Sequence, residues 1–266
     1  MDDIPVLAHR VSGSGTADPV LLMNGGMMTH VGWNQVASGL ASSMPVIGFD
    51  FRGQLMSPGT PPPSIDGHVP DVVALLDHLQ VPRVHVVGTS FGAEVAVVLA
   101  ASHPERVRSL SAITAGDRVT PEMWAAAQPL REAARAAAAG GDGGVLLDLM
   151  MPSAFSPAYL TAQAGALALR RQQFAALPRA WFQGLDGLLG SLEQLDLRPL
   201  LGRITCPTLV VGAELDRTFP IEHSRALAAG IPGAQLEIVP GSGHALVAEA
   251  PDRLLEILLS FLTASS

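Results

Sequence analysis

Residues 84–93 read Val-His-Val-Val-Gly-Thr-Ser-Phe-Gly-Ala, an apolar run followed by a serine between two glycines. Val84–Val87 has the length and composition of a buried β-strand, and an apolar helix is predicted over Ala93–Ser102. A serine between them lies on a tight turn whose backbone is strained, so the flanking positions favour glycine. Its hydroxyl would face the carboxyl edge of the sheet, beside a helix N-terminus whose dipole favours negative charge. We therefore predict that Ser90 is a nucleophile.

Two further polar motifs each follow a predicted strand. The chain reads Pro-Gly-Ser-Gly-His up to His244 and Gly-Ala-Glu-Leu-Asp up to Asp216. A histidine on a glycine-rich loop at this edge of the sheet can reach the serine, and a carboxylate can hold its second ring nitrogen. We predict His244 as the general base and Asp216 as its partner, with Glu214 and Asp117 as alternative acids.

Short aliphatic runs alternate with helical segments through most of the chain. The predicted strands are Val6–Val11, Val20–Met23, Val46–Phe49, Val84–Val87, Leu110–Ile113, Thr208–Val211 and Gln235–Val239. The predicted helices are Trp33–Ser42, Val69–Leu79, Ala93–Ser102, Ser224–Ala229 and Pro251–Thr263. Most of these strands are continuously apolar, as strands are when helices cover both faces of a parallel sheet. The order predicts an α/β fold with a mostly parallel, doubly wound sheet.

This alternation is interrupted between Ala115 and Arg203, where the chain is rich in alanine and leucine and no strand is predicted. The helical segments there are separated by Gly140-Gly141, Pro152, Pro157, Pro178 and Gly190. We predict a core of residues 1–114 and 204–266 with a helical cap insertion over residues 115–203. The insertion is either a set of packing helices or a cap that lines a substrate pocket. Candidate pocket residues are Met150, Met151, Phe155, Tyr159, Trp181 and Phe182.

Composition excludes several kinds of chemistry. Of the 266 residues, 48% are hydrophobic, which is enough for a large core. All 16 basic residues are arginine, so a Schiff-base lysine, a pyridoxal-phosphate anchor and a lysine-bearing phosphate loop are excluded. The single cysteine, Cys206, excludes an intramolecular disulfide and a multi-cysteine zinc site. A net charge of −8 disfavours nucleic acid and anionic membranes as partners.

The sequence also bears on location. The start Met1-Asp2-Asp3 is acidic, the opposite of the basic start of a secretory signal. The stretch from Pro19 to Phe49 carries no charged side chain, but asparagine, glutamine, glycine and proline interrupt it. A membrane-spanning helix is therefore not expected, and we expect a cytoplasmic protein.

The ordered Ser90, Asp216 and His244 motifs resemble those of the α/β-hydrolase superfamily, and the resemblance covers the chain outside the insertion. It implies that residues 21–26, Leu-Leu-Met-Asn-Gly-Gly, form the loop that carries one donor of the oxyanion hole. By this match the backbone N–H groups of Gly26 and Phe91 form that hole, with Met27 as the alternative if the loop is shifted by one residue.

A second segment, Asp50-Phe51-Arg52-Gly53, resembles the family's Asp-x-Arg-Gly turn, and the match implies structural roles for Asp50 and Arg52. The chain also departs from the family pattern. Asn24 replaces the usual histidine, Leu55 stands where a second glycine is common, and Ala93 follows the serine turn where glycine is frequent. None of these changes removes a catalytic group, because the oxyanion donors belong to the main chain.

Together these observations predict a serine hydrolase that cleaves a carboxylic ester of an apolar small molecule through an acyl-enzyme intermediate. The mechanism requires no metal and no cofactor. The predicted substrate-binding residues are Met27, Met150, Met151, Tyr159 and Trp181. Alternative functions on the same residues are a thioesterase or acyltransferase acting on an acyl thioester, and a C–C bond hydrolase. A hydrolase-like small-molecule receptor with little catalysis is an alternative from a different class.

Overall fold

A computed structural model describes residues 6–265, and the acidic start Met1-Asp2-Asp3 lies outside the described residues. One seven-stranded sheet has the order β1-β3-β2-β4-β5-β6-β7. The strands are β1 His9–Ser12, β2 Val20–Met23, β3 Val46–Phe49, β4 Val84–Thr89, β5 Val107–Ile113, β6 Thr208–Ala213 and β7 Gln235–Val239. Neighbouring strands among β2 to β7 all pair in parallel, and the edge strand β1 is antiparallel to β3. The predicted mostly parallel sheet is confirmed.

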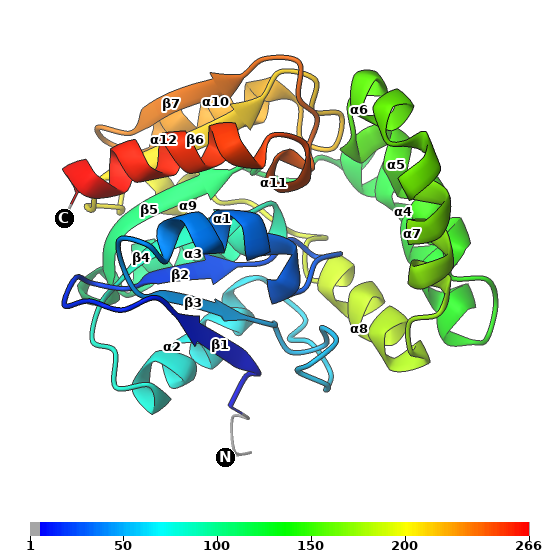
Figure 1. Cartoon of the computed structure of the whole chain (residues 1–266), viewed down its shortest axis with the longest axis horizontal. Helices are drawn as coiled ribbons and strands as arrows, with labels where there is room; N and C mark the ends of the chain where they lie inside the picture. The colour runs from blue at the N-terminus through cyan, green and yellow to red at the C-terminus, as the bar shows by residue number, and fades with distance from the viewer. Residues whose placement is uncertain (1–5, 266) are drawn as a thin grey trace.

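Helices cover both faces of the sheet (Figure 1). The α1 and α12 helices pack on one face, and α2, α3 and α10 pack on the other. Their bounds are α1 Asn34–Leu40, α2 Val69–His78, α3 Phe91–Ser102, α10 Ile221–Gly230 and α12 Pro251–Ala264. The short helices near the sheet are η1 His30–Trp33, η2 Asp66–His68, η3 Pro104–Arg106 and α11 Leu246–Glu249. Strands β2 and β4 are buried along their whole length; β2 accordingly reads as an unbroken apolar run, whereas β4 also carries the buried polar residues His85 and Thr89.

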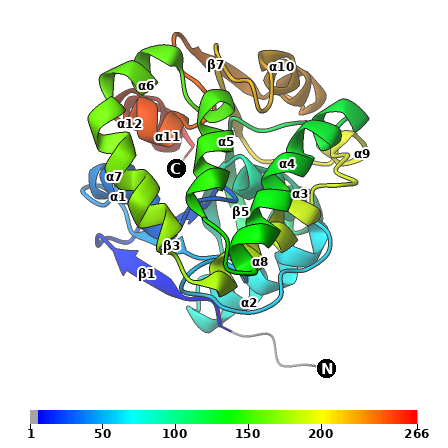
Figure 2. The same cartoon turned by 90° about the vertical axis from the view of Figure 1, so that its right-hand side faces the viewer.

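Between β5 and β6 the chain forms helices and no strand; the one isolated β-bridge there joins Arg118 to Asp196. These helices are α4 Pro121–Ala138, α5 Gly144–Ala154, α6 Pro157–Ala162, α7 Ala164–Ala175, α8 Arg179–Gly190 and α9 Arg198–Leu201. The α4 to α8 helices gather beside the sheet, on the side toward which the parallel strands point (Figures 1 and 2). They enclose a small core of their own, in which Trp181 and Phe182 pack against alanines of α4. No helix within residues 6–265 is long and apolar enough to cross a membrane.

Two details of the predicted elements are wrong. The first strand begins at His9 rather than at Val6, because the Ala8 amide donates to Ser57 Oγ at 2.8 Å instead of continuing a strand ladder. Pro152 does not separate two helical segments but lies inside α5. The proline lacks the backbone N–H that would bond four residues back, and α5 ends two residues after it at Ala154, so the disruption falls in the last turn of the helix.

The turn between β4 and α3 has the strained geometry expected for residue 90. Ser90 has a φ of 50°, in the left-handed region that is costly for a residue with a side chain. Its amide donates to the Ile113 carbonyl of β5 at 2.9 Å, which ties the turn to the neighbouring strand. A Cβ added at Gly88 would lie 2.5 Å from the Gly92 carbonyl oxygen, and one added at Gly92 would meet the backbone of Met23 and Asn24. Both glycines are therefore required by close approach of the backbone.

We predict that Gly92→Ala destabilises the fold by about 3 kcal/mol, because the added methyl group meets backbone that cannot move aside. The matched control is Gly165→Ala on α7, where an added Cβ meets nothing within 4 Å. That change should stabilise the protein by about 1 kcal/mol through helix propensity. Urea unfolding of both variants measures the two effects, and equal stability of Gly92→Ala and the wild type would contradict the argument.

Candidate active site

Polar residues from four loops meet at the carboxyl edge of the sheet. Asn24 follows β2, Ser90 follows β4, Asp216 follows β6, and His244 follows β7. The carboxyl ends of parallel strands all lie at this edge, so residues far apart in the sequence come together there. Ser90 and His244 are half-buried, and Asp216 is buried with 7% of its surface exposed.

Ser90, His244 and Asp216 form one hydrogen-bonded chain. The His244 Nε2 atom lies 2.9 Å from Ser90 Oγ, and its Nδ1 atom lies 2.8 Å from Asp216 Oδ2. A carboxylate only accepts, so Nδ1–H donates to Asp216 and leaves Nε2 free to accept the serine proton. The second carboxylate oxygen of Asp216 accepts from the amides of Thr218 at 2.8 Å and Phe219 at 2.9 Å. These bonds hold the carboxylate in place behind the imidazole.

The two alternative acids have other partners. Glu214 is exposed, and its Oε2 atom accepts from the Gly241 amide at 2.8 Å. Asp117 is buried, and its Oδ1 atom lies 2.6 Å from Nδ1 of His223. The carboxylate in contact with His244 is therefore that of Asp216.

Opposing effects act on the pKa of His244. Burial lowers it, but the charge of Asp216 and the hydrogen bond to Asp216 raise it more, with a smaller contribution from Glu94. The net result is a pKa above the ordinary value for histidine. Phe219 packs beside the ring, with the two ring centroids 6.0 Å apart. The imidazole is therefore packed on this side by an aromatic ring.

Glu94 is a buried carboxyl that the sequence analysis did not identify. It lies on α3, one turn after Ser90, and its Oε1 atom accepts from the Gly116 amide at 3.2 Å. Its Oε2 atom has no hydrogen-bond partner among the described residues. Burial raises the pKa of Glu94 to about 7, against the opposing effects of the Gly116 hydrogen bond and His244. An acidic residue inside an otherwise apolar helix was the one sequence signal that could have revealed it.

The two predicted oxyanion donors lie next to each other. A Cβ built on Gly26 would be 3.8 Å from Phe91 Cβ and 3.9 Å from Leu189 Cδ2 of α8. Phe91 is the first residue of α3, where backbone N–H groups lack partners within the helix. Its ring meets those of Phe51 and His68, each with centroids 5.1 Å away. Burial, ahead of the charge of Arg52, lowers the pKa of His68 to about 3, so it packs there as a neutral ring.

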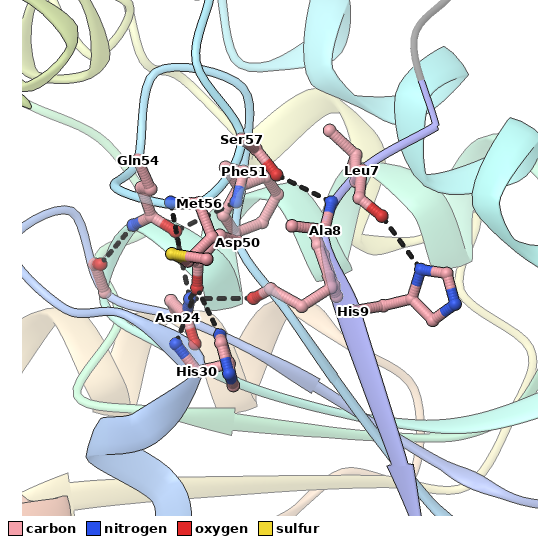
Figure 3. Close-up of polar contacts among 12 residues, drawn as sticks. Leu7, Ala8, His9, Asn24, His30, Asp50, Phe51, Gln54, Met56 and Ser57 are labelled. Carbon is pink, nitrogen blue, oxygen red and sulfur yellow. Dashed lines mark hydrogen bonds and ion pairs between the residues drawn. The ribbon is translucent and has the colours of Figure 1, made fainter. Parts of the chain in front are cut away.

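A polar network around Asp50 supports the loop that carries Gly26 (Figure 3). Asp50 Oδ1 accepts from the backbone amide of His30 at 2.7 Å and lies 2.9 Å from Nδ1 of the same residue. The Asn24 side chain donates to the Phe49 carbonyl at 2.8 Å and to Gln54 Oε1 at 2.9 Å. Asn24, which stands where the family usually has histidine, thus connects the loops after β2 and β3.

Arg52 makes a separate connection, because its Nε atom donates to Asp71 of α2 at 2.9 Å. This ion pair and the bonds to Asp50 join the turn after β3 to its neighbours. Neither Asp50 nor Arg52 has a described contact with Ser90 or His244.

The predicted substrate-binding residues lie on several elements of the insertion and on the Gly26 loop. Met27 packs against the core of the insertion, and Met150 and Met151 are half-buried on α5. The Tyr159 ring stacks on Phe155 with centroids 5.0 Å apart, while Trp181 is buried against Phe174. None of the described polar or ring contacts within residues 6–265 joins these five residues to Ser90 or His244.

The insertion is attached to the loop that carries His244. Glu249 Oε1 accepts from the Ser156 amide at 2.8 Å and from the Gly243 amide at 3.1 Å. The Ala245 amide donates to the Ala154 carbonyl at 2.8 Å. The end of α5 is therefore held beside the histidine loop, a contact for which the sequence contained no signal.

A cavity of about 450 Å³ lies between residues 53–61 and α8. Gln54, Trp181 and Gly184 are among its lining residues, and Ser90 and His244 are not. Of the predicted substrate-binding residues, it includes Trp181 alone.

Known proteins share this architecture. Residues 18–251 match the family model of the alpha/beta hydrolase fold. A pimeloyl-acyl-carrier-protein methyl ester esterase from Chromobacterium violaceum is 34% identical, with 85% of this chain and 87% of that protein covered. A protein named carbamate hydrolase RutD from Variovorax paradoxus is 32% identical, with 90% and 89% covered. The crystal structure of the enol-lactonase from Burkholderia xenovorans LB400 has a TM-score of 0.84 at 26% identity, with 97% and 96% covered.

We predict that Glu94→Gln changes how stability depends on pH. The folded protein raises the pKa of Glu94 from 4.5 to about 7, so it holds this proton more tightly than the unfolded chain does. Its stabilising contribution is full below about pH 4.5 and is lost as the pH rises to about 7, a loss of about 3 kcal/mol. The amide does not ionise, so the variant should gain stability relative to the wild type over this range.

Thermal unfolding of both proteins at a series of pH values checks this prediction. A difference in Tm between wild type and Glu94→Gln that stays constant from about pH 4.5 to about pH 7 would show that Glu94 does not titrate in this way.

Proposed function

The chain belongs to the alpha/beta hydrolase family, and from this premise we propose that it is a serine hydrolase that cleaves a carboxylic ester of an apolar small molecule. The observation that carries the proposal is the hydrogen-bonded chain from Ser90 through His244 to Asp216, with distances of 2.9 and 2.8 Å. Such a chain allows a hydroxyl to act as a nucleophile at neutral pH, because a base accepts its proton as it attacks.

The proposed reaction has two halves. His244 Nε2 takes the proton of Ser90 Oγ as this oxygen attacks the ester carbonyl, and the carbonyl electron pair moves onto its oxygen. The amides of Gly26 and Phe91 donate to that oxyanion. As the tetrahedral intermediate collapses, the ester C–O bond breaks and the imidazolium protonates the leaving alcohol. Water then attacks the acyl-enzyme with the same assistance from His244, and the acid is released.

Asp216 keeps His244 in the required orientation throughout. The carboxylate accepts from Nδ1, so the imidazole is held in the tautomer whose Nε2 can accept a proton. It also stabilises the positive charge that forms on the ring. Its own position is maintained by the two backbone amides that donate to its other oxygen.

The relatives support an ester-like carbonyl compound as the substrate. Their names describe a methyl ester esterase, an enol-lactonase and a carbamate hydrolase. Esters, lactones and carbamates all carry a heteroatom on the carbonyl carbon, which leaves when a serine attacks. Methionine, leucine and aromatic side chains of the insertion favour an apolar substrate, and a Cβ built on Gly26 would lie 3.9 Å from Leu189 Cδ2 of α8. We assign residues 115–203 as its cap, with Met27, Met150, Met151, Tyr159 and Trp181 as binding residues.

We predict that Ser90→Ala lowers kcat on a p-nitrophenyl acyl ester by at least about 10⁴-fold, because the nucleophilic oxygen is removed. The control is Ser102→Ala at the far end of α3, where Oγ donates to the Val98 carbonyl. This control should retain the wild-type rate. A panel of acyl chain lengths run on all three proteins defines the acyl preference at the same time.

Labelling with a fluorophosphonate measures the reactivity of Ser90 independently of ester turnover. The wild type should be labelled and Ser90→Ala should not. Wild-type turnover by Ser90→Ala would overturn the assignment of the nucleophile. Tight binding of small molecules by a wild type that neither labels nor turns over esters would instead indicate a receptor.

We predict that kcat/KM rises with pH as His244 loses its proton, because only the neutral imidazole acts as a base. The midpoint should lie above the ordinary histidine pKa, since Asp216 outweighs the effect of burial. Asp216→Asn removes the charge that raises this pKa, so its midpoint should move to lower pH. Its kcat should also fall, by about 10⁴-fold, through loss of the correct tautomer. An unchanged midpoint in this variant would contradict the role given to Asp216.

A further inference from the structure

The side chain of Gln54 is buried, with 1% of its surface exposed, and both ends of its amide are hydrogen-bonded. Its Oε1 atom accepts from the Phe51 amide at 2.9 Å and from Asn24 Nδ2 at 2.9 Å. Its Nε2 atom donates to the Gly25 carbonyl at 2.9 Å. One partner is a backbone N–H and another is a backbone carbonyl, so the orientation of the amide is determined by its neighbours. Figure 3 shows Gln54 beside Asn24 and Asp50.

The carbonyl of Gly25 and the N–H of Gly26 belong to one peptide unit. Because that unit is planar and trans, holding its oxygen also fixes the direction of its N–H. Donation to the carbonyl oxygen also polarises the peptide, which makes the N–H a stronger donor. The same oxygen accepts from the Met28 amide at 3.0 Å, so Gln54 supplies one of two donors that hold this peptide.

We propose that Gln54 is a positioning residue for the oxyanion hole: it orients and polarises the peptide whose N–H, that of Gly26, faces the reacting carbonyl. This inference rests on the proposed function, because the Gly26 amide is an oxyanion donor only if Ser90 attacks a carbonyl. Gln54 holds the peptide of the Gly26 N–H more closely than the peptide of the Met27 N–H. Gln54 Nε2 is 2.9 Å from the Gly25 oxygen but 3.5 Å from the Gly26 oxygen, which belongs to the peptide of the Met27 N–H.

A glutamine suits this position because it must accept on one side and donate on the other. A tight turn holds it there: the Gln54 amide donates to the Phe51 carbonyl at 2.8 Å, and Gly53 has a φ of 96°. The backbone of Gly184 on α8 packs directly against Gly53. Gln54 is thus braced by the helical insertion on one side and contacts the oxyanion loop on the other.

The first test is Gln54→Met, which keeps the length of the side chain but can neither donate to Gly25 nor accept. We expect kcat on a p-nitrophenyl ester to fall about tenfold with KM within about twofold of wild type. The loss is smaller than the 10²–10³-fold that follows removal of a whole oxyanion donor, since the Met28 bond remains. Labelling by a fluorophosphonate should slow by a similar factor.

The control is Ser57→Ala, a change on the same loop. Ser57 is also buried, and its Oγ atom accepts from the Ala8 amide at 2.8 Å, away from the oxyanion loop (Figure 3). This variant should lose thermal stability and keep the wild-type kcat. An equal loss of kcat in Ser57→Ala, or a folded Gln54→Met with wild-type kcat, would overturn the proposal.

Gln54→Glu provides a second test of the proposal, which applies even if Gln54→Met does not fold. A protonated carboxyl can still donate to the Gly25 oxygen, whereas an ionised one cannot. The charged and titratable groups around this position are Asp50, His30 and Arg52 on the network and Asp186 across the cavity. Burial at this position should raise the pKa of the introduced carboxyl above its ordinary value, so the ratio of variant to wild-type kcat should fall with rising pH as this carboxyl loses its proton.

The ratio cancels the titration of His244, which both proteins share. A ratio that stays at unity over the whole pH range measured would overturn the proposal. Failure of the proposed function can be told apart from failure of the role given to Gln54. If the proposed function is wrong, Ser90→Ala turns over esters or the wild type does not. If only the role of Gln54 is wrong, ester turnover still requires Ser90 but does not change when Gln54 is substituted.

Discussion

The strained turn at Ser90 is the constraint on which the rest of the site depends. A positive φ at a serine costs about 1–3 kcal/mol and persists only where the surroundings enforce it. Here a fully buried strand leads into the turn and a helix buried on nearly every side leads out of it. The Ser90 amide is also bonded to β5. Because Gly88 and Gly92 have no side chains, strand, helix and the loop after β2 can approach closely enough to enclose the serine.

Two buried carboxyls lie near His244, and their surroundings give them different properties. Asp216 accepts from two backbone amides and from the imidazole, so both of its oxygens have a donor. Glu94 accepts from one amide and has a second oxygen without a partner, so burial dominates and its pKa rises to about 7. The number of hydrogen-bond donors therefore distinguishes the carboxyl that contacts the base from the one whose pKa is raised by burial.

An amide network joins the loops after β2 and β3, and it includes Asn24, which stands where the family usually has a histidine. Asn24 and Gln54 bond to each other within this network. Amides do not ionise, so the support of the Gly26 peptide should not depend on pH within the range in which His244 titrates. The insertion contacts both sides of the site, through Gly184 against Gly53 and through Glu249 beside the histidine loop.

The order of strands and helices, the serine turn and the histidine and aspartate motifs were predictable from sequence, because each depends on neighbours a few residues away. Apolar runs, glycines beside Ser90 and a glycine-rich loop before His244 are local patterns. The sequence left Glu214 and Asp117 as alternatives to Asp216 for the partner of His244. It also did not indicate the contacts that Glu94, Glu249 and Gln54 make. Such features depend on contacts between distant segments, for example across the 93 positions that separate Ser156 from Glu249. Only the folded chain decides them, since sheet order determines which loops meet and burial determines which polar groups keep a partner.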